Sequence, residues 1–123
     1  MTMCGLFGTN ENENQINIWT RIESIESLEN AFLTSYEKNV VILKHSDRCS
    51  ISRFAKRRLE NEISSSSSSD CIFYLIDVVN FRSISISLAE KVNVQHESPQ
   101  LLVISKGICV KNASHEGVNW PLY

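Results

Sequence analysis

The chain has 123 residues, about the length of one average domain, so two independent domains are effectively excluded. Its content of 42% hydrophobic and 21% charged residues excludes both a disordered tail and a membrane bundle. With a net charge of -2 and a pI near 5.9, the overall charge gives no reason to bind nucleic acid or an anionic membrane, so any basic site must be local.

The N-terminus lacks the features of an export signal. Residues 1–8 carry neither a positive start nor an apolar run, and no stretch approaches the roughly 20 apolar residues that span a bilayer. We therefore expect a cytoplasmic protein. Residues 1–15, rich in Asn and Glu towards their end, predict a mobile lead-in to a single domain over residues 16–123.

The first half of that domain alternates helical and strand patterns. A weak strand is expected over residues 16–20. A helix capped by Ser24 follows, with apolar residues every three or four positions: Ile22, Ile25, Leu28, Phe32 and Tyr36. The run 40–43 (VVIL) predicts a strand buried on both faces. A second helix is predicted by the spacing of Ile51, Phe54, Ala55, Leu59 and Ile63.

The second half continues the alternation. The serine-rich stretch 64–70 predicts a flexible loop, and residues 71–76 predict another buried strand ending at Asp77. Ile84, Leu88 and Val92 predict a third helix. Residues 101–104 and 108–110 read as a hairpin with Gly107 in its turn. This order predicts an α/β fold with a mixed central sheet and helices on both faces, which fits a thioredoxin-like fold best.

Cys49 is the candidate nucleophile. It stands where the strand over residues 40–43 gives way to the second helix, and a helix N-terminus favours a thiolate over a thiol. Arg48, Lys44, His45 and Arg53 are close in sequence and could add positive potential that lowers the pKa of the thiol. The alternative interpretation is an ordinary cysteine at a helix start.

Pro99 is the second residue that points to a functional site. It directly precedes the hairpin and follows Ser98, so the Ser98–Pro99 bond is a candidate for a cis peptide in a tight turn. The thioredoxin fold places a cis-proline beside its reactive cysteine, and the backbone before that proline pairs with the substrate chain. The alternative is a trans proline that opens an edge strand.

Five stretches resemble the bacilliredoxins of YtxJ type, a monothiol branch of the thioredoxin fold. They are LKHSDRCSIS at 43–52, LIDV at 75–78, AEK to Val94 from residue 89, HESPQLL at 96–102 and ASH at 113–115. The resemblance covers residues 19–115 in the same order, and its HESPQ run is far more specific than the cysteine motif alone. Ser50 stands where the family usually has proline. The chain also ends soon after the ASH segment, so the C-terminal helix is expected to be missing or very short.

The resemblance implies a monothiol enzyme that removes bacillithiol from oxidised protein cysteines. Ser52 occupies the position of a second cysteine; it cannot resolve a mixed disulfide but could donate a hydrogen bond to the Cys49 thiolate. The expected catalytic residues are therefore Cys49 and Ser52, and the expected substrate-binding residues are Arg48, Lys44, His45, Ser98 and Pro99. Bacillithiol, a carboxylate-bearing thiol, is the expected co-substrate, with no bound cofactor.

Other assignments remain open. Cys71 and Cys109 fall in apolar strand runs and are expected to be buried core thiols, while Cys4 is the freer candidate for a resolving thiol. His45 and Cys49 supply only two ligands, so no metal site is expected. The expected partners are bacillithiolated proteins and a small thiol, with no nucleic acid and no membrane, and the protein is expected to be a monomer or weak dimer. The alternatives are a glutaredoxin-like enzyme that uses another small thiol and a redox-inactive binding module.

Overall fold

A computed structural model of the chain describes residues 17–66 and 70–120. The expected lead-in over residues 1–15 and Cys4 lie outside the described residues, as do positions 67–69 of the serine-rich loop. Within the described part, no helix combines the length and the apolar character needed to cross a membrane.

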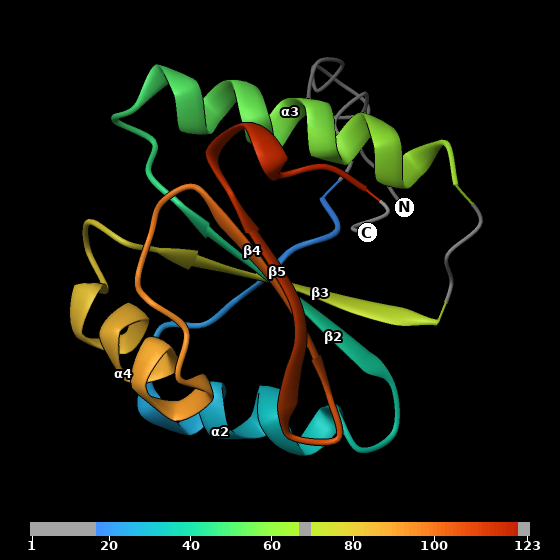
Figure 1. Ribbon diagram of the computed structural model, residues 1–123, viewed down its shortest axis with the longest axis vertical. Coiled ribbons are helices and arrows are strands. Elements are labelled where there is room, and N and C mark those ends of the chain that lie inside the picture. Colours follow the sequence, from blue (N-terminus) through green and yellow to red (C-terminus); the bar gives the residue numbers. More distant parts are fainter. Residues whose placement is uncertain (1–16, 67–69, 121–123) are drawn as a thin grey trace, which may run out of the picture.

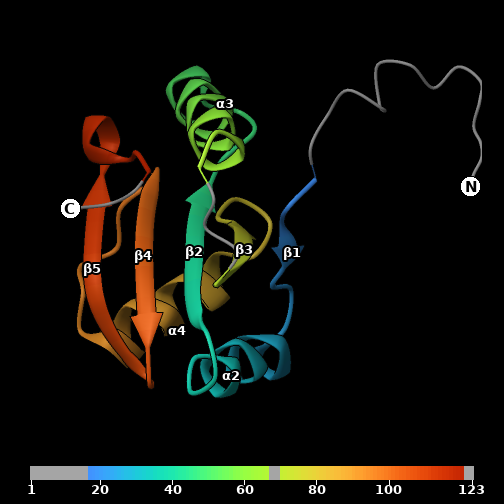
Figure 2. The same cartoon turned by 90° about the vertical axis from the view of Figure 1, so that its right-hand side faces the viewer.

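The sheet has five strands in the order β1-β3-β2-β4-β5 (Figure 2). Their bounds are β1 Thr20–Arg21, β2 Asn39–His45, β3 Cys71–Asp77, β4 Gln100–Ser105 and β5 Ile108–Ser114. β1, β3 and β2 pair in parallel, and β4 and β5 are antiparallel. The predicted mixed sheet is confirmed, although the first strand has only two residues, Thr20 and Arg21.

Helices cover both faces of the sheet, as predicted (Figure 1). α2 (Ile25–Thr34) and α4 (Arg82–Val92) lie on one face, and α3 (Ser50–Ser64) with the short 3-10 helix η1 (His115–Gly117) lies on the other. Side chains alternate along β2, so Val40 and Ile42 pack with α2 and α4, whereas Val41 and Leu43 pack with α3. Two apolar cores result, one on each face.

The helix boundaries follow local chemistry. The side chain of Ser24 caps α2 by accepting from the backbone N–H of Ser27, as predicted, and Ser27 returns a capping contact to the backbone N–H of Ser24. Because this cap starts the helix at Ile25, Ile22 lies before it, fully buried and hydrogen-bonded to β3. Leu28 and Phe32 of the predicted apolar stripe are also buried, and the prediction was wrong at Ile25 and Tyr36, which are exposed.

The predicted stripe of the second helix also needs correction. α3 buries Ser52, Ala55, Leu59 and Ile63 against the sheet. Ile51 and Phe54 are instead 65% and 68% exposed. The buried arc is rotated away from them because Ser52, a polar residue, is drawn inwards by its hydrogen bonds to the preceding loop. Ala55, Leu59 and Ile63 are therefore buried as predicted, and the predicted stripe was wrong at Ile51 and Phe54.

The C-terminal segment replaces a final helix with a short cover, as expected. η1 is followed by Val118, which is fully buried and whose carbonyl oxygen accepts a 2.6 Å hydrogen bond from Arg58 of α3. Trp120 and Trp19 both make edge-on contacts with Phe73 of β3. The α3 face is thus closed by aromatic side chains from the two ends of the described chain.

Candidate active site

Cys49 is the residue that directly precedes α3. Its backbone is extended, and its side chain makes no capping hydrogen bond to the helix, so the partly exposed thiol is free. The unpaired N–H groups and positive dipole of a helix N-terminus create an environment that stabilises negative charge. The helix begins at Ser50 without the proline that the family usually has there. Cys49 therefore stands at the start of a helix, the position from which the sequence predicted a nucleophile.

A buried hydrogen-bond chain holds the loop between β2 and Cys49. His45 Nε2 lies 2.7 Å from Asp47 Oδ1, and His45 Nδ1 lies 2.8 Å from Ser52 Oγ. Ser52 Oγ also accepts from the backbone N–H of Ser46 at 3.1 Å. Burial lowers the pKa of His45, and the nearby Asp47 carboxylate only partly opposes this effect. The ring is therefore neutral near pH 7, with its proton on Nε2 facing Asp47.

The Ser52 hydroxyl hydrogen-bonds to His45 and not, as expected, to the Cys49 thiolate. A hydroxyl has one proton, and neutral His45 needs it at Nδ1. Among the described residues, no hydrogen bond joins Ser52 to the sulfur of Cys49. Ser52 is 1% exposed, so it is enclosed beneath the loop. In this structure it positions the Cys49 loop through His45.

Lys44 does not face Cys49 as a source of positive potential. It is fully buried on the α4 side of the sheet, where its Nζ donates to the carbonyl oxygen of Ser85 and to His96 Nδ1, both at 3.1 Å. The Ser85 hydroxyl also lies 3.1 Å from His96 Nδ1. Because an ammonium has only donors, His96 Nδ1 acts as acceptor and its ring proton is on Nε2. Burial lowers the pKa of Lys44 to about 8.

The bond between Ser98 and Pro99 is cis, as predicted. Gln100 pairs with Lys44 in the sheet, so buried Pro99 lies at the end of β2 where the Cys49 loop begins. The carbonyl oxygen of Pro99 accepts from the backbone N–H of His115. The backbone of Ser98 makes no hydrogen bond to the described residues and is partly exposed. The predicted substrate-pairing segment thus lies at the end of the sheet from which the Cys49 loop leaves.

The basic side chains beside Cys49 are on the surface. Arg48 is exposed and its backbone N–H contacts Ser46 Oγ at 3.3 Å. Arg53 donates to the carbonyl oxygen of Asp47 at 2.7 Å and so ties the first turn of α3 to the loop. The sequence did not identify three residues that hydrogen-bond to the predicted site residues Lys44 and His45. They are Asp47, Ser85 and His96. Asp47 and His96 lie in stretches that carry the family resemblance, which was the available signal; Ser85 had none.

The described thiols other than Cys49 are at the opposite end of the sheet. Cys71 pairs with Asn39 at the start of β2, and Cys109 pairs with Ile104, which pairs with Val40. Five or six strand residues separate these positions from His45, about 17–20 Å. A disulfide needs Cα atoms within about 7 Å, so neither thiol is in reach of Cys49. Both are partly buried rather than fully buried as expected, and burial raises the pKa of each.

Comparisons with known proteins identify a family and solved structures of similar fold. A family profile described as monothiol bacilliredoxin BrxC matches residues 20–121. A solved structure described as a putative oxidoreductase with a thioredoxin fold is 31% identical, with 83% of this chain and 87% of that chain covered and a TM-score of 0.73.

Two thioredoxin structures are more distant. The thioredoxin of Malassezia sympodialis is 20% identical, with 76% of each chain covered and a TM-score of 0.60. That of Fasciola hepatica is 16% identical, with 76% of this chain and 84% of that chain covered and a TM-score of 0.62. These two show the fold alone, and the predicted thioredoxin-like α/β class is confirmed.

Proposed function

The chain belongs to the monothiol bacilliredoxin family, and on that premise we propose that it removes bacillithiol from mixed disulfides on protein cysteines. The family match and the 31% identical oxidoreductase support the broader statement, a thioredoxin-fold thiol oxidoreductase with a single reactive cysteine. What we propose beyond this is that the small thiol is bacillithiol, that the substrates are bacillithiolated proteins, and that the residues named below have the stated roles. The observation that carries it is the free Cys49 thiol directly before α3, at the same end of β2 as the cis bond at Ser98–Pro99.

The proposed reaction has two thiol–disulfide exchanges. The Cys49 thiolate attacks the bacillithiol sulfur of the mixed disulfide, forming a Cys49–bacillithiol disulfide and releasing the protein cysteine as a thiolate. A second bacillithiol thiolate then attacks the bacillithiol sulfur bound to Cys49. This step forms oxidised bacillithiol and returns the Cys49 thiolate. Atoms and electrons balance with bacillithiol as the only reductant.

The surrounding residues have distinct proposed roles. The unpaired backbone of Ser98 pairs with the substrate chain next to its modified cysteine, and Pro99 fixes that segment against β2. Arg48, exposed next to Cys49 in the chain, adds positive charge that attracts the anionic bacillithiol towards the thiol. Because Cys71 and Cys109 are distant, the Cys49 adduct waits for a second small thiol. We propose that the protein acts in the cytoplasm on bacillithiolated proteins.

The proposal is tested by measuring release of bacillithiol, and in parallel glutathione, from a mixed disulfide on a test protein. We expect the wild type to release bacillithiol rapidly and Cys49→Ala to release none, with Cys71→Ala as the matched control that retains activity. A preference for glutathione would replace the small thiol in the proposal. Release of neither thiol, with Cys49 unmodified by intact mass, would leave a thioredoxin-fold binding module.

A further inference from the structure

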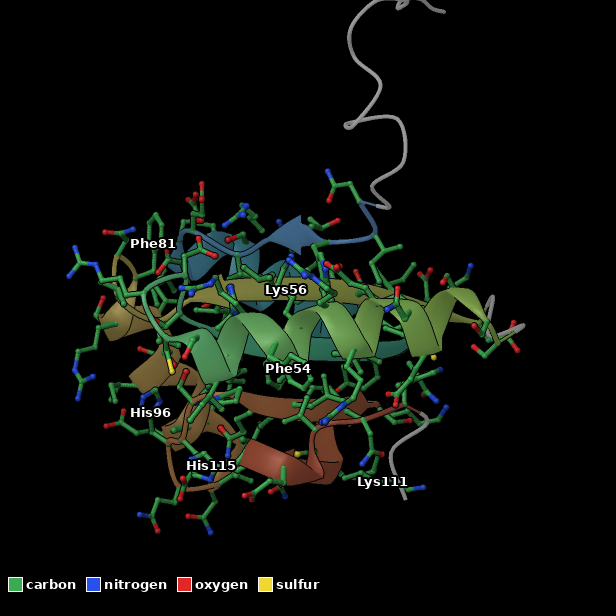
Figure 3. The ribbon with its side chains drawn as sticks, turned by 90° about the horizontal axis from the view of Figure 1, so that it is seen from above. Phe54, Lys56, Phe81, His96, Lys111 and His115 are labelled. Atoms are coloured by element: carbon green, nitrogen blue, oxygen red, sulfur yellow. The ribbon has the colours of Figure 1, made fainter. Side chains whose placement is uncertain are left out.

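A groove of about 770 Å³ lies along the side of α3 that faces β1. Its walls come from the segment around β1, from the Cys49 loop and from α3; the lining residues that the argument uses are Trp19, Arg21, Asp47, Arg53, Lys56 and Arg57. In Figure 3, Lys56 lies on the side of α3 that faces β1, where the groove is, and Phe54 lies on the opposite side, towards η1. The volume is in the range of small-molecule sites.

The groove concentrates positive charge on an acidic chain. Four cationic side chains line it against two carboxylates, those of Asp47 and Glu60, although the chain as a whole has a charge of -2. Both carboxylates are already engaged: Glu60 accepts from Lys56 and from the Trp19 indole, and Asp47 contacts His45. The surplus positive charge is therefore not neutralised by the groove's own acidic groups.

Two guanidinium groups in the groove are available to a ligand. Arg21 and Arg57 are exposed and make no hydrogen bond or salt bridge with the described residues, whereas Lys56 is paired with Glu60. The charge of Arg21 contributes to the lowered pKa of the Asp77 carboxyl, but the two side chains form no salt bridge. They come from different elements, β1 and α3, and so flank the groove from two sides. A guanidinium binds carboxylates in a planar, bidentate geometry.

One end of the groove is formed by the loop that leads to Cys49 and by the first turns of α3. Asp47, which lines it, is two residues from Cys49, so their Cα atoms are at most about 7.6 Å apart. Arg53, also in the lining, donates its backbone N–H to the carbonyl oxygen of Cys49 at 3.0 Å. A ligand whose sulfur is at Cys49 can therefore extend along α3 into the groove.

We propose that this groove binds the carboxylates of the low-molecular-weight thiol through Arg21, Arg57 and the free guanidinium nitrogens of Arg53. The inference rests on the proposed function for the identity of the thiol as bacillithiol. It adds a binding site on the β1 side of α3, away from the cis bond at Ser98–Pro99, which is left for the protein substrate. One thiol and one protein chain then approach Cys49 from different sides.

The first test separates binding from chemistry. Calorimetry with S-methyl bacillithiol and S-methyl glutathione measures affinity without any disulfide exchange. We expect S-methyl bacillithiol to bind the full-length protein, and Arg21→Gln and Arg57→Gln each to raise its Kd about tenfold. Lys38→Gln, which removes one exposed charge before β2 at the opposite end of the sheet, is the matched control and keeps the wild-type Kd. An unchanged Kd in the double arginine variant would overturn the proposal.

The second test uses turnover. The arginine variants are expected to raise KM for a bacillithiol mixed disulfide while leaving the reaction with a 2-mercaptoethanol mixed disulfide unchanged, because that thiol is neutral. A KM for the bacillithiol mixed disulfide that is unchanged from wild type in the double variant would refute the groove and leave the proposed function intact. Arginine-dependent binding of S-methyl bacillithiol without any turnover would support the groove and refute the proposed function.

Discussion

Lys44 and His45 are neighbours in the chain, but their side chains lie on opposite faces of the sheet. Both belong to β2, which continues to His45, and successive residues of a strand point in opposite directions. Lys44 therefore contacts Ser85 and His96 beneath the sheet, and His45 contacts Ser52 and Asp47 above it. Lys44 thereby holds the loop before Pro99, and His45 holds the loop before Cys49.

Burial of Lys44 predicts a pH-dependent stability. Its pKa is about 8 in the folded protein and 10.5 when unfolded. Between these values the unfolded chain binds more protons, so the contribution of Lys44 to stability rises with pH across this window. We expect the difference in unfolding free energy between wild type and Lys44→Met to shift in favour of the wild type by about 3 kcal/mol between pH 8 and 10.5. Urea unfolding over this range measures it, and a constant difference would contradict the account.

Ser52 offers a second prediction for a single residue. Ser52→Ala leaves the N–H of Ser46 and Nδ1 of His45 without a partner in a buried place, so we expect it to destabilise the protein by about 1–3 kcal/mol. Because the hydroxyl proton is used by His45, the alkylation rate of Cys49 by iodoacetamide should change less than about threefold. Ser50→Ala, at an exposed position, is the control. A large fall in alkylation with unchanged stability would instead favour a direct bond to the thiolate.

The elements themselves were largely predictable from sequence. Short β-branched runs identified β2, β3 and β4, and the cap at Ser24 and the turn at Gly107 were local signals. The turn requires positive φ at Lys106 and Gly107, and a side chain at Gly107 would meet the Tyr36 hydroxyl at 2.6 Å. In the protein itself, the backbone N–H groups of Lys106 and Gly107 donate to Ser35 and so join the α2–β2 connection to the hairpin, and no local sequence pattern indicates this contact.

Orientation of side chains was less predictable than the elements. The sequence placed Ile51 and Phe54 in a buried stripe because apolar spacing was the only guide to the phase of α3. The actual phase depends on Ser52, whose burial is explained by a tertiary hydrogen bond to His45. Lys44 was likewise a candidate source of positive potential near Cys49 because it is close in sequence, but sequence alone did not show which face of β2 its side chain occupies.

The segment after η1 gives a prediction at the scale of an element. Val118 is fully buried where the family usually has a helix, so Val118→Ala should destabilise the protein by about 2 kcal/mol through lost burial and a cavity. Val110→Ala, the same change at a position that is 53% exposed, should cost less than about 0.5 kcal/mol. Urea unfolding compares them, and equal effects would mean that the 118–120 segment does not cover the α3 face.

Across the whole molecule, the sheet separates the reactive end from the remaining described thiols. Cys49 and the cis bond at Ser98–Pro99 lie at the carboxyl end of β2, with Cys71 and Cys109 near its start. We therefore expect the Cys71→Ser/Cys109→Ser double variant to release bacillithiol at the wild-type rate. A rate reduced more than about tenfold, with the fold retained by circular dichroism, would show that one of these thiols takes part.

The most direct test of the central claim, a one-cysteine cycle, is intact mass after a single turnover. The protein is mixed with one equivalent of a bacillithiol mixed disulfide, without free thiol, and quenched with acid. The account predicts a stable species heavier by one bacillithiol, with the adduct on Cys49, that disappears only when free bacillithiol is added. A protein that carries no adduct and contains a disulfide between two of its own cysteines would contradict the one-cysteine cycle.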